Sequence, residues 1–155
     1  MGSGPIVVTP DERPKPLDLV GEDMTVLVSG VQTGSYEIFL QVGREGSGPP
    51  PHHHSWDEAF FVLRGEVTFG ANGDESTVEP GTLVHIPGGT VHWFKLAAGG
   101  AEMLSITSTA GASDFFTAIS RDAAGNVPDF AELLRIAASH GNTILVPPTD
   151  ANGAG

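Results

Sequence analysis

The chain has 155 residues, 39% of them hydrophobic, with 21 glycines, 12 prolines, no cysteine and a net charge of −12. This length favours one domain with its own core, and the many turn-forming residues favour short strands over a helical bundle. The negative charge would repel phosphate backbones and anionic lipid headgroups, which argues against nucleic acid or a membrane as partner.

The N-terminal segment, residues 1–21, is rich in proline and acidic residues and has no periodic pattern. We expect it to form an extended arm. It lacks the basic start and the apolar stretch of a secretory signal peptide, and no apolar run approaches the roughly 20 residues of a membrane-spanning helix. With the absence of cysteine, these features favour a cytoplasmic protein.

Short apolar runs separated by turn residues occupy the next part of the chain, residues 22–110. They lie at 25–29, 36–42, 59–63, 66–70, 82–86, 91–96 and 102–108. This pattern is typical of an antiparallel sandwich or a small barrel. Asn72 and Gly73, between two of these segments, favour a type I′ hairpin turn. We therefore predict an all-β fold for this region.

The pattern becomes helical from Ser113 onward. Residues 113–120 are expected to form a short helix, and residues 128–141 a clearer one that ends near Gly141. This second helix is amphipathic, so it must dock on the barrel mouth as a lid, on the outer sheet or at a dimer interface; its apolar face consists of Phe130, Leu133, Leu134 and Ala137. Residues 143–148 resemble a last strand. We interpret residues 111–155 as a helical extension of the same domain.

Three consecutive histidines, His52 to His54, are followed by Glu58. Side chains two apart in a strand share a face, so His52 and His54 can point together while His53 points away. Glu58 has the same parity, and His92 follows a Pro/Gly turn at the start of another strand. Three imidazoles and one carboxylate would form a site for a first-row divalent metal, with one or two positions left for water or substrate.

The spacing of these residues resembles the two motifs of the cupin family. The first motif reads Gly46, five residues, His52-x-His54, three residues, Glu58, six residues and Gly65. The second reads Gly81, five residues, Pro87-x-Gly89, two residues and His92. The asparagine often found four residues after the last histidine is Leu96 here, a departure that concerns a polar contact and not the ligands.

This resemblance implies a cupin jelly-roll β-barrel of residues 22–110 with short C-terminal helices. It also implies one divalent transition metal, which could be iron, manganese, nickel, cobalt, copper or zinc, bound by His52, His54, Glu58 and His92. A cupin that has lost its metal is the alternative.

Three further histidines are given other roles. His53 is expected to be a bystander, and His85 a strand residue rather than a fifth ligand. His140 is expected to serve the free carbonyls at the C-terminal end of the helix.

We expect the substrate pocket to lie inside the barrel. Interior side chains of a small barrel fill one end and line a cavity at the other. Arg64 and Lys95 have outward parity, so a phosphorylated substrate, which needs a cationic clamp, fits less well than an apolar or aromatic small molecule. The predicted pocket residues are Tyr36, Ile38, Phe60, Val62, Phe94, Leu96, Phe115 and Phe116.

The C-terminal part also resembles quercetinase-like cupins, in which a Phe-Phe segment and a helix ending in His-Gly follow the barrel. The implied function is a dioxygenase that acts on an enolisable or hydroxylated aromatic molecule. The substrate's enolate oxygen would ligate the metal, and Glu58, as the catalytic residue, would hold the metal and accept a proton. The alternatives are a redox-neutral cupin, such as a polyketide cyclase or isomerase, and a non-enzymatic small-molecule-binding cupin. We expect a homodimer.

Overall fold

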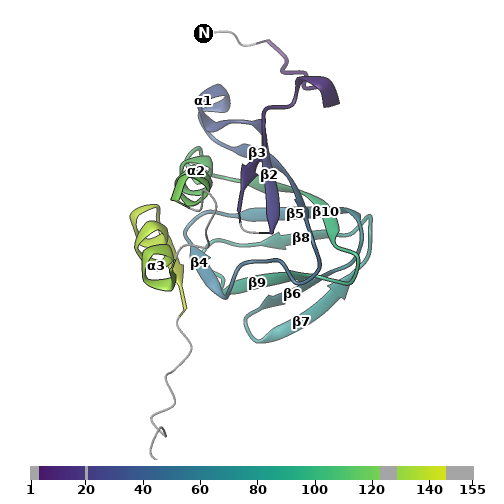
Figure 1. The fold of residues 1–155 in the computed structure, drawn as a ribbon, viewed down its shortest axis with the longest axis vertical. Helices are drawn as coiled ribbons and strands as arrows, with labels where there is room; N and C mark the ends of the chain where they lie inside the picture. Colours follow the sequence, from purple (N-terminus) through teal and green to yellow (C-terminus); the bar gives the residue numbers. More distant parts are fainter. Residues whose placement is uncertain (1–3, 20, 123–128, 146–155) are drawn as a thin grey trace, which may run out of the picture.

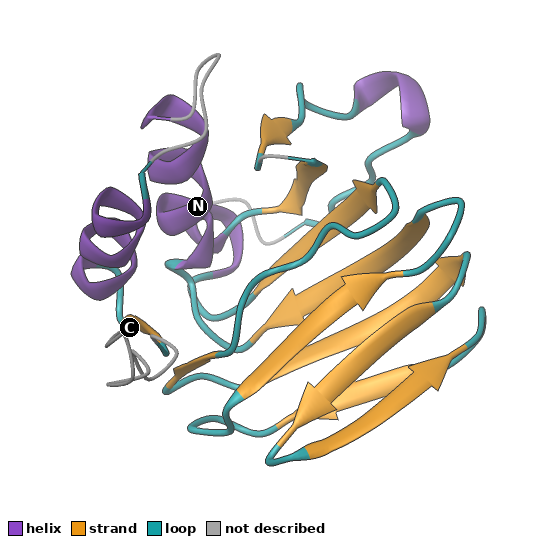
Figure 2. Cartoon of the chain, turned by 60° about the horizontal axis from the view of Figure 1, so that its bottom comes forward, coloured by secondary structure: helices purple, strands orange, loops and turns teal. Residues whose placement is uncertain are grey.

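The computed structural model describes residues 4–19, 21–122 and 129–145. Two antiparallel sheets face each other, and two helices lie side by side at one end of them (Figures 1 and 2). The six-stranded sheet has the order β1-β2-β3-β10-β5-β8, and the five-stranded sheet has the order β11-β4-β9-β6-β7. This is a jelly-roll arrangement, and it confirms the predicted all-β class with short C-terminal helices.

In chain order, the strands are β1 (Leu17–Asp18), β2 (Glu22–Val28), β3 (Glu37–Gly43), β4 (His52–His54), β5 (Glu58–Arg64), β6 (Val67–Ala71), β7 (Asp74–Val78), β8 (Leu83–Ile86), β9 (His92–Leu96), β10 (Ala101–Thr107) and β11 (Asn142–Ile144). The helical elements are a 3-10 helix (Pro10–Glu12), α1 (Gly30–Thr33), α2 (Ala112–Asp122) and α3 (Phe130–Ser139).

Each predicted apolar run contributes to a strand, but the polar strand β7 has no such run. Its residues are largely exposed because it lies at the edge of its sheet and pairs only with β6 among the described strands. Asn72 and Gly73 join β6 to β7 with φ values of 51° and 88°, the left-handed backbone of a type I′ turn. The predicted N-terminal arm is not extended throughout, because it contains the 3-10 helix, and its strand β1 pairs with β2.

Apolar side chains from both sheets fill the space between them. The core consists of Phe60, Val62, Val67, Phe69, Ile86, Phe94, Leu96, Ala101 and Met103. Burying large side chains of this kind contributes roughly 1.5–3 kcal/mol each. This cluster leaves room for a cavity at the opposite end of the sandwich, near the helices, where Met24, Phe39 and Ala112 form a second core cluster.

The helices are attached to that opposite end by specific contacts. Phe116 of α2 packs edge-on against Phe39 of β3, with ring centroids 5.2 Å apart. The buried carboxylate of Glu37 accepts hydrogen bonds from the backbone N–H groups of Gly30 (2.9 Å) and Ser113 (2.8 Å). α2 is therefore fixed to β3 by both apolar and polar contacts.

The C-terminal part returns from α3 to the barrel. Nδ1 of His140 donates to the carbonyl of Ile136 at 2.9 Å, which confirms the role expected for this histidine. β11 then pairs with β4. Pro128 and residues 146–148, which belong to the predicted elements, lie outside the described residues. None of the described helices has the length and apolar character needed to cross a membrane.

Candidate metal centre

The four predicted ligands come together in the structure. His52, His54, Glu58 and His92 each offer one ligand atom, and these atoms all lie within 4.8 Å of one another. The first two belong to β4, Glu58 begins β5 and His92 begins β9, where it faces His52 across the strand pair. His53 has the opposite parity and pairs with Thr143 of β11.

The two sequence motifs are tied together by the turn that precedes β9. The N–H of Gly89 donates to the carbonyl of His54 at 2.7 Å, and the N–H of Gly88 donates to Oδ1 of Asp57 at 2.8 Å. A Cβ atom on Gly88 would lie only 2.2 Å from the carbonyl oxygen of Ser55. This close packing requires glycine, and it brings the start of β9 to the other ligands.

Backbone carbonyls orient all three imidazoles in the same way. The Nδ1 atoms of His52, His54 and His92 donate to the carbonyls of Pro50 (2.9 Å), Trp56 (3.0 Å) and Thr90 (2.8 Å), respectively. Such contacts fix the orientation of a ligating histidine and direct its other nitrogen toward the metal. The three Nε2 atoms are therefore the candidate ligand atoms.

Glu58 faces two of these Nε2 atoms through a single carboxylate oxygen. Its Oε2 lies 3.1 Å from Nε2 of His54 and 3.3 Å from Nε2 of His92. Burial alone would raise the pKa of Glu58, but the contacts with His54 and His92 prevail and lower the pKa to about 2. The carboxylate is thus ionised at neutral pH, which is the form that binds a cation.

His52 and His54 differ in their surroundings. Burial, reinforced by the nearby His92, lowers the pKa of His52 to about 4, so its imidazole is neutral at pH 7. The ring of His54 stacks on the indole of Trp56, with centroids 4.1 Å apart and an interplanar angle of 3°. Only neutral imidazole ligates a metal, and burial favours that form at His52.

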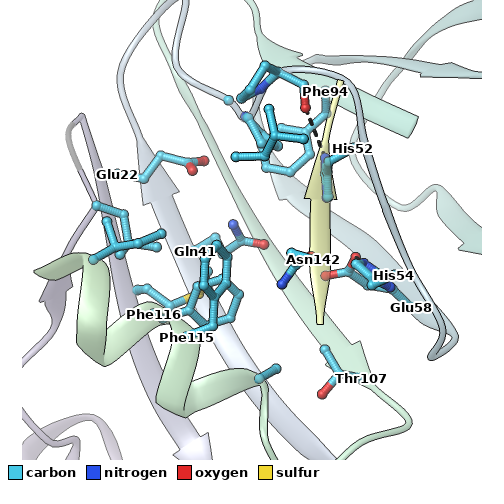
Figure 3. Close-up of a pocket in the computed structure, with 18 of the residues that line it drawn as sticks. Glu22, Gln41, His52, His54, Glu58, Phe94, Thr107, Phe115, Phe116 and Asn142 are labelled. Carbon is cyan, nitrogen blue, oxygen red and sulfur yellow. Dashed lines mark hydrogen bonds and ion pairs between the residues drawn. The ribbon is translucent and has the colours of Figure 1, made fainter. Parts of the chain in front are cut away.

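A cavity of about 290 Å³ opens beside these ligands. His52, His54 and Glu58 form part of its wall, and Figure 3 shows these side chains opposite Phe115 and Phe116 of α2. Of the predicted pocket residues, Phe60, Phe94, Phe115 and Phe116 line this cavity. The described lining contains no arginine or lysine.

Four predicted pocket residues lie elsewhere, so they require correction. The inward face of β3 carries Glu37, Phe39 and Gln41, and therefore Tyr36 and Ile38 have the wrong parity. Val62 and Leu96 do point inward, but they lie further along their strands, in the packed core. For Val62 and Leu96 the predicted parity was therefore correct, and the predicted position along the barrel was not.

One histidine and one tryptophan complete the comparison with the sequence. His85 is exposed on β8, opposite Ala59 of β5, and is not part of the ligand cluster. Trp56 lines the cavity and supports His54, a contact that no spacing pattern predicted.

Three polar residues of the cavity wall, Glu22, Gln41 and Asn142, were missed entirely. The inward parity that Gln41 shares with Phe39 was the available signal.

The comparisons with known proteins agree with this geometry. Residues 39–107 match the family model described as the Cupin domain. A quercetin 2,3-dioxygenase from Bacillus subtilis (strain 168) is 26% identical over 91 residues, which are 57% of this chain but only 27% of that protein. The match therefore spans about a quarter of the curated relative's length.

Solved structures share the fold at low sequence identity. An RmlC-like cupin from Shewanella frigidimarina superposes with a TM-score of 0.60 at 13% identity and covers 68% of this chain and 92% of its own. The polyketide cyclase RemF from Streptomyces resistomycificus gives a TM-score of 0.59 at 18% identity, covering 67% and 78% of the two chains. Residues 39–107 of this chain thus match the Cupin domain, and the whole fold is the jelly roll of these solved cupin structures, with His52, His54, Glu58 and His92 all inside the matched range.

Proposed function

We propose that this protein is a metal-dependent cupin dioxygenase that acts on a hydroxylated aromatic small molecule. The observation that carries this proposal is the largely buried cluster of three histidines and one glutamate at the wall of a mainly apolar cavity. The 26% identity to a quercetin 2,3-dioxygenase supports the same class of substrate.

The donor set fits a first-row divalent metal. Three Nε2 atoms and a carboxylate form an N3O set, and the Nδ1 contacts hold the imidazoles in place before any metal arrives. A bound divalent metal would supply Lewis acidity, which lowers the pKa of a coordinated hydroxyl group.

Glu58 is proposed to hold the metal and to accept the substrate proton. Both histidine contacts use Oε2, and among the described residues no protein group bonds to Oε1. The carboxylate therefore keeps one oxygen for a second role. A positioned base contributes about 10²–10⁴ in rate.

The cavity wall is proposed to orient the substrate and to exclude water. Trp56, Phe94, Phe115 and Phe116 present aromatic surface to the cavity, and such surface favours an aromatic ligand. Without a lysine or arginine in the described lining, the cavity has no clamp for a phosphate group.

A redox-neutral reaction, such as that of a polyketide cyclase or an isomerase, is the second candidate. The fold similarity to RemF favours it, and the same donor set can stabilise an enolate without oxygen. The two candidates differ in one measurable requirement, which is dioxygen.

The metal proposal is tested by two neighbouring variants. His54→Ala should lose most of the bound metal and lower the melting temperature of the metal-loaded protein, because a ligand that binds the native state stabilises it. His53→Ala is the matched control and should keep its metal. Elemental analysis of protein purified without affinity nickel measures the metal content of both variants. Equal losses of metal in the two variants would refute the ligand assignment.

The oxygen requirement is tested with the wild-type protein. Turnover of flavonols and other enolisable aromatics should require oxygen and consume it stoichiometrically, as measured with an oxygen electrode. Full activity under anaerobic conditions, especially with zinc bound, would reject the dioxygenase and favour the cyclase or isomerase class. Binding without any turnover would leave a non-enzymatic cupin.

We also propose that the protein forms a homodimer through the outer face of the six-stranded sheet. Exposed apolar side chains gather on this face, namely Val42, Phe61, Leu63, Leu83 and Ile106. Apolar surface of this kind marks protein interfaces.

A further inference from the structure

We propose that Glu22, Gln41 and Asn142 form a polar subsite that binds the hydroxyl groups of the substrate remote from its metal-binding end. This inference rests on the proposed function. It assigns partners to the substrate's remote hydroxyl groups, for which the apolar part of the cavity wall provides none.

The three side chains contain unpaired polar atoms. Within the described part of the chain, the buried side-chain atoms without a hydrogen-bonding partner are Oε1 of Glu22, Oε1 of Gln41 and Nδ2 of Asn142. The residues are only 7%, 4% and 3% exposed, respectively. A buried polar atom without a partner destabilises the folded state, so three together need a reason other than stability.

All three residues line the cavity that contains the candidate ligands. In Figure 3, Asn142 lies between Gln41 and the pair formed by His54 and Glu58, and Glu22 lies beyond Gln41. The strand registers agree with this view. Asn142 pairs with His54, whereas Gln41 pairs with Met24, two residues from Glu22 on the same face of β2.

Glycine makes room for the outermost member of the subsite. Gly43 of β3 lies opposite Glu22, and a Cβ atom at this position would approach Cγ of Glu22 to 2.9 Å. The same Cβ would lie 2.5 Å from Cδ1 of Leu96. The carboxyl group of Glu22 therefore extends over a position without a side chain.

The chemistry of the subsite suits hydroxyl groups. Oε1 of Gln41 accepts hydrogen bonds and Nδ2 of Asn142 donates them, and a hydroxyl group can act as both donor and acceptor. Burial raises the pKa of Glu22 to about 7, so near neutral pH this carboxyl group is available as a donor in one form and an acceptor in the other. With no cation in the described lining, a carboxylate or phosphate on the substrate would be disfavoured. The class of ligand is an uncharged, polyhydroxylated aromatic molecule.

Two flavonols test the subsite directly. Quercetin carries several hydroxyl groups, and 3-hydroxyflavone keeps the metal-binding hydroxyketone but none of the others. Their dissociation constants for the metal-loaded protein are measured without oxygen by quenching of tryptophan fluorescence. Wild type should bind quercetin at least about tenfold more tightly, since an unpaired polar site discriminates against a ligand that lacks its partner. In Gln41→Met and Asn142→Leu, this ratio should fall toward one.

Thr107→Val is the matched control. The hydroxyl group of Thr107 borders the same cavity, but it is already bonded to the carbonyl of Thr109 at 3.2 Å. The ratio of the two affinities should therefore not change in this variant. Equal affinity of wild type for both flavonols, or a ratio that Gln41→Met and Asn142→Leu leave intact, would overturn the subsite while the proposed function stands.

A ligand-free measurement separates the two proposals. Gln41→Met and Asn142→Leu remove unpaired polar atoms at similar volume, so both should raise the melting temperature of the ligand-free protein. If neither flavonol binds to wild type, the proposed substrate class is wrong, and higher melting temperatures would still support a polar ligand subsite. Lower melting temperatures in both variants would mean that these groups are structural, and the subsite would be rejected.

Discussion

Glu58 faces two imidazoles through one carboxylate oxygen, Oε2. Its two proposed roles, metal ligand and proton acceptor, can therefore be tested separately. Glu58→Gln should retain part of the metal, because an amide oxygen still coordinates weakly. Turnover should fall by about 10²–10⁴, because the amide does not accept a proton at neutral pH. Metal content by elemental analysis and kcat on the same preparation measure the two effects. Parallel losses of metal and activity would leave Glu58 as a ligand only.

Glu22 predicts a pH dependence of stability. Its pKa rises from 4.5 in the unfolded chain to about 7 in the folded protein, because its carboxyl group is buried. Between these values the folded state holds a proton that the unfolded state has released. Stability is therefore lost as the pH rises through this window, by about 3 kcal/mol in total.

Glu22→Gln isolates this contribution, because the variant has no proton to release at this position. Urea unfolding of both proteins at pH 5 and pH 8 provides the measurement. Relative to the variant, wild type should be about 2–3 kcal/mol less stable at pH 8 than at pH 5, because the unfolded chain still holds part of a proton at pH 5. Parallel pH profiles would show that the carboxyl group of Glu22 is not buried in solution.

At the level of elements, Glu37 joins three of them. From β3, its carboxylate accepts N–H groups at the start of α1 and in the first turn of α2. The first N–H groups of a helix have no partner within the helix, and a carboxylate there is stabilising. Glu37→Ala should therefore lower the free energy of unfolding by about 1–3 kcal/mol for each donor left unpaired.

The matched control is Glu102→Ala on the neighbouring strand β10. Glu102 makes an exposed ion pair with Arg64 at 3.7 Å, and such pairs contribute about 0–1 kcal/mol. Chemical denaturation of both variants gives the comparison. A loss at Glu37 no larger than the loss at Glu102 would contradict the anchoring role.

The sequence predicted the residues of the site whose positions follow from spacing along one strand or one turn. His52, His54 and Glu58 follow one another closely, and His92 follows a Pro/Gly turn, so motif and parity placed all four. Asn142 could not be found in this way, because it enters the cavity through the pairing of β11 with β4, a contact between distant segments.

The position of an inward-facing residue along the barrel could not be predicted from the sequence either. Val62 shares the inward parity of Glu58, yet it lies in the packed core and not at the cavity. Parity says which face a side chain occupies, but the depth of the cavity depends on how both sheets and the helices close the end of the barrel. The clustering of the four candidate ligands was therefore predictable, and much of the cavity wall was not.

For the whole molecule, the outer face of the six-stranded sheet is the main apolar surface to explain. Leu104 of β10 lies opposite Phe61 of β5, and Phe61 lies opposite Leu83 of β8, so apolar side chains form a row across three strands. Phe61 is 38% exposed and Leu83 is 62% exposed. Contact with a second copy of the chain would bury this row.

The double variant Phe61→Glu, Leu83→Glu should convert the proposed dimer to a monomer, because charges in an apolar interface cost several kcal/mol. Sedimentation velocity measures the oligomeric state. Val31→Glu is the control, since Val31 is apolar and 98% exposed on α1 but lies outside the row. A monomeric wild type, or a double variant that stays dimeric, would refute this interface.

The cupin match ends at residue 107, yet β11 places Asn142 beside His54 and α2 supplies Phe115 and Phe116 to the cavity. The flanking segments therefore build much of the cavity wall and contribute none of the four candidate ligands. We therefore expect mutations in these segments to alter which molecule the cavity accepts while all four candidate ligands stay in place. Among descendants of such a protein, we expect substrate preference to diverge first in the segments outside the cupin domain.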